Sequence, residues 1–193
     1  MRVLLVDSDA ASAALLKDLL LRRGHEVTAV ENADGACQEA QRRSFPLALL
    51  EWAPCGSDED SLCRRFRAIE GAQETVVVAI TGAHHPQHGI DAISAGADDF
   101  VLKPFEMDLL EVRLSLAEHR AIQVIDRKAV EQALLQTQER YRVLVDTVPD
   151  VICSVSADDG TFIALNPAFE KTTGWSAIHA NACCCNSAGV PVG

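Results

Sequence analysis

The sequence has no excess of positive charge and no long apolar run. It carries 17 Lys and Arg against 28 Asp and Glu, a formal net charge of −11. A broad basic surface for nucleic acid is therefore not expected. The apolar runs Val3–Val6 and Val76–Ile80 are far shorter than the roughly 20 residues of a membrane-spanning helix. The first residues also lack the apolar stretch of a signal peptide. We expect a cytoplasmic protein that has neither nucleic acid nor a membrane as a partner.

The sequence also lacks a regular cysteine pattern. Its seven cysteines are odd in number and show no CxxC spacing, so neither a disulfide framework nor a metal site is expected at Cys183–Cys185. No charged residue follows Lys171, and residues 177–193 show no amphipathic period. We predict that this tail is disordered.

Residues 1–119 alternate short apolar runs with amphipathic segments. The apolar runs have the length of strands, and the segments between them repeat apolar residues at helical spacing. The pattern predicts strands at 2–6, 26–30, 47–50, 75–80 and 99–102, and helices at 10–22, 34–43, 58–69, 87–95 and 107–119. Such alternation is typical of an α/β fold with a doubly wound, five-stranded parallel sheet. We take residues 1–119 as the first domain.

Polar residues follow four of the predicted strands. They are Asp7, Ser8 and Asp9 after the first strand, Glu51 after the third, Thr81 after the fourth and Lys103 after the fifth. The carboxyl ends of the strands lie side by side in a doubly wound sheet, and ligands bind there. Carboxylates suit Mg²⁺, lysine suits phosphate, and a threonine hydroxyl can donate to a phosphoryl oxygen. The set predicts a metal-assisted phosphoryl site, although Asp7 or Asp9 taken alone is more typical of a helix cap.

Four stretches of this domain resemble the receiver domain of two-component response regulators, which has a flavodoxin-like fold. They are residues 3–9, 47–52, 79–82 and 95–105. The resemblance implies that Asp7 helps to hold Mg²⁺ and that Thr81 and Lys103 contact the phosphoryl group. It further implies that Phe100 is the switch aromatic and that the peptide bond before Pro104 is cis. A sensor histidine kinase or another signalling protein is the implied partner.

Two residues depart from the receiver pattern. Ser8 stands where the family usually has a second acid, and Asp9 compensates only if its loop turns it inward. Glu51 stands at the phosphoacceptor position, where the family has aspartate. The extra methylene displaces the carboxylate, and a displacement of about 1 Å can cost about 100-fold in rate. We expect Mg²⁺ to bind weakly or not at all. Its ligands would be Asp7 and Glu51, and also Asp9 if the loop turns that residue inward.

These departures favour a degenerate receiver that acts in phosphorelay signalling through protein–protein contact and is not normally phosphorylated. In such a receiver, either Glu51 reaches Lys103, imitates the charge of a phosphorylated site and locks an active-like state, or the domain serves only as a docking module. The alternatives are Mg²⁺-dependent phosphorylation at Glu51, a dimerising module without phosphotransfer, and retention of the fold alone. We do not expect an enzyme, since only the Asp7-Ser-Asp9 stretch matches the nucleophile motif of haloacid-dehalogenase-type phosphatases.

Residues 120–148 predict a helical or coiled-coil linker. Apolar and small side chains recur there at alternating spacings of four and three; they are Val130, Leu134, Thr137, Tyr141, Leu144 and Val148. The segment is either a signalling coiled coil that continues the last receiver helix and allows a homodimer, or a solvated helix with one apolar stripe.

Residues 139–176 resemble the start of a PAS sensor domain in the stretches 139–150 and 159–176, and we take residues 149–176 as the start of that domain. Pro149 ends the linker helix, a hairpin follows over residues 151–165, and a last helix ends near Gly174. The further strands of a PAS sheet are absent from this sequence, so a complete ligand pocket is not expected. We interpret the chain as a truncated or frame-shifted product, or as an excerpt of a longer signalling protein.

Overall fold

The computed structural model describes residues 1–52, 62–82, 87–158 and 161–174. The chain divides into two compact units, residues 1–128 and 129–193, and each is described by itself. The tail predicted at 177–193 lies outside the described residues, as do Cys183–Cys185. Among the residues that are described, no helix is both long and apolar enough to cross a membrane.

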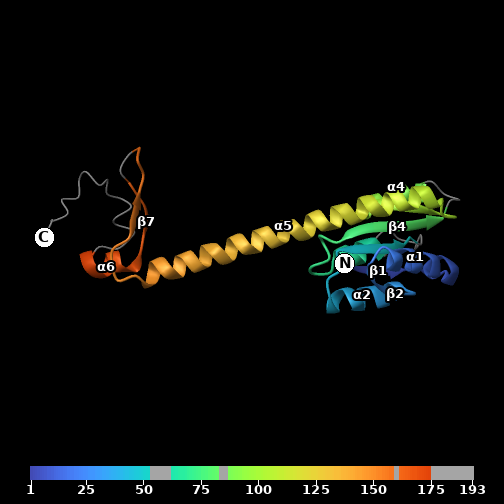
Figure 1. Ribbon diagram of the computed structural model, residues 1–193, viewed down its shortest axis with the longest axis horizontal. Coiled ribbons are helices and arrows are strands. Elements are labelled where there is room, and N and C mark those ends of the chain that lie inside the picture. Colours follow the sequence, from blue (N-terminus) through green and yellow to red (C-terminus); the bar gives the residue numbers. More distant parts are fainter. Residues whose placement is uncertain (53–61, 83–86, 159–160, 175–193) are drawn as a thin grey trace. The chain divides into compact units, whose positions relative to one another are not determined.

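The first unit is built on a five-stranded parallel sheet (Figure 1). Its strands are β1 (Arg2–Val6), β2 (Glu26–Val30), β3 (Leu47–Glu51), β4 (Val76–Gly82) and β5 (Asp99–Lys103). They lie in the order β2-β1-β3-β4-β5, and each neighbouring pair is parallel. The predicted α/β doubly wound, flavodoxin-like sheet is thereby confirmed.

Helices cover both faces of this sheet. They are α1 (Ala10–Arg22), α2 (Ala33–Arg42), α3 (Leu62–Arg67), α4 (Gln87–Ser94) and α5 (Met107–Thr147). Leu5 and Leu49 pack with residues of α1 and α5 on one face, while Leu4 and Leu50 pack with α2, α3 and α4 on the other. All four leucines are fully buried. Strands that are apolar at successive positions are expected when both faces of a sheet are covered.

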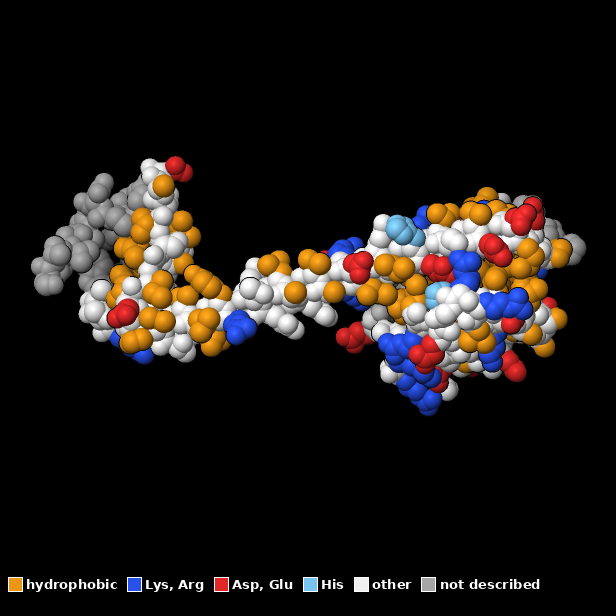
Figure 2. Space-filling view, viewed as in Figure 1, with side chains coloured by type: hydrophobic (Ala, Val, Ile, Leu, Met, Phe, Trp, Pro, Cys, Tyr) orange, Lys and Arg blue, Asp and Glu red, His pale blue; other side chains and the backbone are white. Residues whose placement is uncertain are grey.

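Helix α5 runs without a break from Met107 to Thr147 and carries both the last predicted receiver helix and the predicted linker. Leu110, Leu114, Ala117 and Ala121 form its buried stripe in the first unit. In the second unit the seam side chains from Val130 to Leu144 are exposed, Val130 to 69%, whereas Val148 is half-buried. Figure 2 shows hydrophobic side chains along this part of the helix. Whether they form a coiled coil stays a prediction.

Glu118 ties α5 to the turn between α1 and β2. Its Oε1 accepts hydrogen bonds from Arg23 Nε at 2.7 Å and from His25 Nε2 at 2.9 Å. Burial alone raises the pKa of Glu118, but the hydrogen bonds from Arg23 and His25 outweigh it, so the pKa lies below its ordinary value. The carboxylate is therefore held in its charged form, and it anchors α5 beside the sheet.

Arg67, the last residue of α3, binds the segments that lead into β4 and β5. Its Nη1 donates to the carbonyl of Thr75 at 2.6 Å, and its Nε donates to the carbonyl of Gly96 at 2.9 Å. Its Nη2 pairs with Asp98 Oδ2 at 2.7 Å, and the same oxygen accepts from the amide of Val77. One guanidinium thus fixes the amino ends of two neighbouring strands.

The second unit contains an antiparallel hairpin and a short helix. The hairpin consists of β6 (Cys153–Val155) and β7 (Phe162–Leu165), and α6 (Pro167–Thr173) follows. The helix ends at Gly174, whose φ of 74° is left-handed, the conformation that glycine adopts most easily at a helix end. The rings of Phe162 and Phe169 lie 5.7 Å apart and pack α6 on the hairpin. These elements confirm the predicted α+β fragment.

Candidate functional site

The four polar strand ends meet at the carboxyl edge of the sheet. Asp7 directly follows β1, whose last residue Val6 pairs with Leu50, and Glu51 is the last residue of β3. Thr81 and Lys103 are among the last residues of β4 and β5, and Lys103 pairs with Gly82 across the two strands. The sheet therefore brings together residues that lie 96 positions apart in the chain.

Lys103 lies between two carboxylates. Its Nζ is 2.6 Å from Asp7 Oδ1 and 3.3 Å from Glu51 Oε1. The Asp7 side chain is fully buried, whereas 22% of Lys103 and 26% of Glu51 is exposed. An unpaired carboxylate at the position of Asp7 would be costly, so the ammonium of Lys103 is the charge that compensates it.

Two further donors hold the carboxylate of Asp7. The hydroxyl of Ser12, a buried residue in the first turns of α1, donates to Oδ2. The backbone amide of Asp9 donates to Oδ1 at 3.0 Å. Sequence reasoning missed Ser12, although it lies on the same helical stripe as the buried Leu16 and Leu20.

Glu51 reaches the loop after β1 as well as Lys103. Its Oε2 accepts a hydrogen bond from the backbone amide of Ser8 at 2.8 Å. The two oxygens of Glu51 are thus shared between a lysine ammonium and a backbone amide. An acid group that is satisfied in this way has a fixed orientation.

Asp9 is the N-cap of α1. Its Oδ1 accepts from the amide of Ala11 at 3.1 Å, and the residue is exposed. Asp is among the preferred N-cap residues, because its carboxylate accepts from the free amides of the first turn. Its side chain therefore serves the helix.

Among the described residues, neither Thr81 nor Phe100 joins the hydrogen bonds of Asp7, Glu51 and Lys103. Thr81 is 1% exposed, and among the described residues its Oγ1 has no hydrogen-bond partner. Phe100 is half-buried, and the guanidinium of Arg113 lies 5.3 Å from the centre of its ring. The peptide bond between Lys103 and Pro104 is cis, as the receiver resemblance implies.

The family model for the response regulator receiver domain matches residues 3–115, more than half of the chain. The chain belongs to the response-regulator receiver family. A PAS-domain model matches residues 139–189, in agreement with the second resemblance. The receiver unit thus carries the matched sheet and its strand-end residues, and the second unit carries the matched PAS start.

Known relatives of the receiver unit are response regulators. The phosphate regulon transcriptional regulatory protein PhoB of Rhizobium meliloti is 28% identical over 120 residues, which make up 62% of this chain and 53% of PhoB. The chain spans about half to two thirds of the length of the curated relatives it matches. Its similarity therefore concerns the receiver part of such proteins.

Two solved receiver domains share this fold. The receiver domain of NtrX from Brucella abortus is 31% identical with a TM-score of 0.52, and the match covers 63% of this chain and 98% of that domain. The receiver domain of sensor histidine kinase PA1611 from Pseudomonas aeruginosa PAO1 is 24% identical with a TM-score of 0.51, over 58% of this chain and 93% of that domain. Its crystal structure has a magnesium ion coordinated in the active-site cleft.

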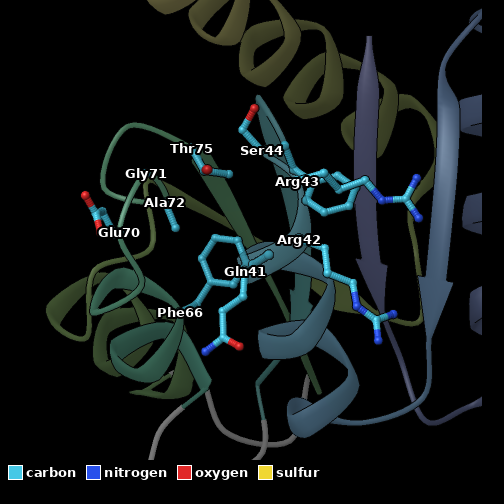
Figure 3. A pocket seen from close by; sticks show the side chains of 11 residues that line it. Gln41, Arg42, Arg43, Ser44, Phe66, Glu70, Gly71, Ala72 and Thr75 are labelled. Carbon is cyan, nitrogen blue, oxygen red and sulfur yellow. The ribbon is translucent and has the colours of Figure 1, made fainter.

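A cavity of about 230 Å³ lies at the opposite, amino-terminal edge of the receiver sheet (Figure 3). It is lined by the segment Ala40–Phe45, by Phe66 of α3, by residues 70–72 and by Thr75. None of the strand-end residues described above contributes to it. The arginines beside it, Arg42 and Arg43, are each paired with Glu39. The candidate site is therefore the cluster formed by Asp7, Ser12, Glu51 and Lys103 at the carboxyl edge of the sheet.

Proposed function

We propose that this chain is a degenerate receiver module in which Glu51, at the phosphoacceptor position, is held in an ion pair with Lys103 and is not phosphorylated. The observation that carries the proposal is the double use of Glu51, which faces Lys103 Nζ at 3.3 Å and accepts from Ser8 N at 2.8 Å. Phosphotransfer to a carboxylate needs an oxygen placed in line with the donor phosphorus, and hydrogen bonds to both oxygens restrict how the carboxylate can turn toward it. Both oxygens of Glu51 are engaged within the protein.

The donor set does not fit Mg²⁺. This ion needs near-ideal octahedral geometry, and it is usually held through one or two carboxylates together with water. Asp7 and Glu51 both face Lys103, Ser12 and the Asp9 amide occupy further sites on Asp7, and the Asp9 side chain caps α1. We propose that the ammonium of Lys103 supplies the positive charge of this site.

The ion pair imitates the charge of a phosphorylated site, but it does not make the contact to Thr81 that the phosphoryl oxygens would make. Thr81 Oγ1, the group that the family resemblance assigns to the phosphoryl oxygens, has no partner among the described residues. Glu51 therefore makes no hydrogen bond to Thr81 among the described residues. This favours a docking module of fixed conformation over a switch that is locked in its activated state.

Protein–protein contact is the output that suits such a module. The partner is a sensor histidine kinase or another signalling protein, because the relatives of this unit are response regulators. The module acts as a signalling component and turns over no substrate of its own.

Phosphorylation with a small-molecule donor tests this proposal. The full chain is incubated with acetyl phosphate and Mg²⁺ and analysed by intact mass, beside the variant Glu51→Asp and the control Glu51→Gln. We expect no phosphoryl adduct on the wild type or on Glu51→Gln, and a hydroxylamine-labile adduct on Glu51→Asp. A stable adduct on wild-type Glu51 would overturn the proposal and establish phosphotransfer at that residue.

The exposed seam on α5 favours a second candidate, a homodimer formed through the linker. Val130, Leu134 and Leu144 are each more than half exposed. Light scattering of the full chain and of a chain ending at Lys128 separates the two cases, since Lys128 still pairs with Glu74 of the receiver unit at 2.6 Å. A dimer that becomes a monomer on truncation, and also in the variant Leu134→Glu, supports dimerisation through the linker. A monomeric full chain contradicts it.

A further inference from the structure

Asn166 occupies an unusual position in the second unit. It is the N-cap residue of α6 and is only 2% exposed, but its side chain makes no capping hydrogen bond to that helix. Asn is among the residues favoured at N-caps because its side chain satisfies the free amides of the first turn. The side chain of Asn166 is therefore used elsewhere.

The amide of Asn166 is directed at the end of helix α5. Its Nδ2 donates to the carbonyl of Asp150 at 2.9 Å and lies 3.2 Å and 3.4 Å from the carbonyls of Val145 and Val148. The last carbonyls of a helix have no partner within the helix and need donors from outside. Asn166 supplies such a donor from a residue 21 positions further along the chain.

Pro149 explains why this end of α5 needs an outside donor. In a continuing helix the carbonyl of Val145 accepts from the backbone N–H four residues later, which is position 149. Proline has no N–H, so that bond is missing. The side-chain amide of Asn166 takes the place of the backbone donor that Pro149 lacks.

The other end of the same side chain holds the hairpin. Asn166 Oδ1 accepts from the backbone amide of Ile152 at 2.9 Å, and the backbone amide of Asn166 donates to the carbonyl of Ile152 at 3.0 Å. Ile152 directly precedes β6, and Asn166 directly follows β7. One residue therefore joins both strands of the hairpin to the last turn of α5.

We propose that Asn166 is the coupling residue of the second unit, through which a displacement of the end of α5 is transmitted to the β6–β7 hairpin. It donates to the helix end and accepts from the hairpin, so the two elements share one buried side chain. The proposal does not depend on the state of Glu51, and it assigns to the PAS-like fragment a defined mechanical connection to the linker helix.

Hydrogen exchange of the full chain tests the coupling with a matched pair of Asn→Asp substitutions. Asn166→Asp keeps the shape and the acceptor, but it replaces the donor with an acceptor that faces three carbonyls. Asn32 is also an N-cap residue, but its side chain only accepts, from the amide of Gly35 at 2.8 Å, so Asn32→Asp is the control. We expect about tenfold or greater loss of protection at the Ile152 amide in Asn166→Asp, with amides of the receiver unit unchanged, and little loss in Asn32→Asp.

A double-mutant cycle with Pro149 separates coupling from general loss of stability. Pro149→Ala restores a backbone N–H that can reach Val145, so it should reduce the effect of Asn166→Ala on the protection of the last turn of α5. Additive effects of the two substitutions, or unchanged Ile152 protection in Asn166→Asp, would overturn the proposal.

Discussion

Gly89 of α4 packs directly against the ring of Phe100 on β5. A Cβ atom at position 89 would lie 2.7 Å from two ring carbons, closer than real contacts allow. Arg113 lies against the same ring and is ion-paired with Asp99. Phe100 is thus held between a bare backbone and a fixed guanidinium, and its position depends on the absence of a side chain at residue 89.

Gly89→Ala should therefore displace Phe100 and destabilise the receiver unit. We expect a loss of about 1–3 kcal/mol in the free energy of unfolding, the usual effect of overpacking, measured by urea denaturation. Gly82→Ala is the matched control, because a Cβ atom there meets nothing within 4 Å. Equal effects of the two substitutions would show that the contact with Phe100 is unimportant.

Ser12→Ala should destabilise the receiver unit through the loss of a hydrogen bond to Asp7. The substitution leaves Oδ2 of the buried Asp7 without its hydroxyl donor, and we expect a loss of about 1–2 kcal/mol. Ser94, exposed on α4, serves as the control. If Ser12→Ala and Ser94→Ala have the same stability, Ser12 does not support Asp7.

Lys103→Met should have the largest effect among the site residues. It removes the counter-charge of the fully buried Asp7 carboxylate, and breaking such a pair costs about 3 kcal/mol. Asp7→Asn in the same background should recover part of the loss, because it removes the charge left unpaired. A loss no greater than that of Lys17→Met, at an exposed position of α1, would contradict the assignment.

The pKa of Glu118 predicts a pH dependence of stability. Hydrogen bonds from Arg23 and His25 hold this pKa below the ordinary value of 4.5, so the carboxylate stabilises the folded state above pH 4.5. Wild type should exceed Glu118→Gln by about 1–2 kcal/mol at neutral pH, and the difference should shrink as the pH falls below 4.5. A constant difference between pH 7 and pH 3 would show that the charge is not responsible.

The fold and the strand-end residues were predictable because they depend on patterns along the chain. Apolar runs predicted the strands, and parallel strands place their carboxyl ends at one edge, so Asp7, Glu51 and Lys103 were expected to meet there. The grouping of these three charges therefore follows from topology before any side chain is placed.

The residues that sequence reasoning missed depend on the direction of single side chains across elements. Ser12, Arg67 and Asn166 are polar residues of the kinds that also occupy solvated helix and loop positions. Their partners are carbonyls or acids that become neighbours only after folding. The direction of the Asp9 side chain could not be predicted either. The sequence left open whether it turned inward or capped α1, and in the structure its carboxylate caps the helix.

Titration with Mg²⁺ tests most directly whether Lys103 stands in for the metal. Trp52 reports on the site, because it follows Glu51 directly and its amide donates to the carbonyl of Ile80 at 2.7 Å. The wild type should show no saturable change in Trp52 fluorescence up to millimolar Mg²⁺, whereas the double variant Ser8→Asp, Glu51→Asp should show one. Saturable binding by the wild type at submillimolar Mg²⁺ would contradict the account.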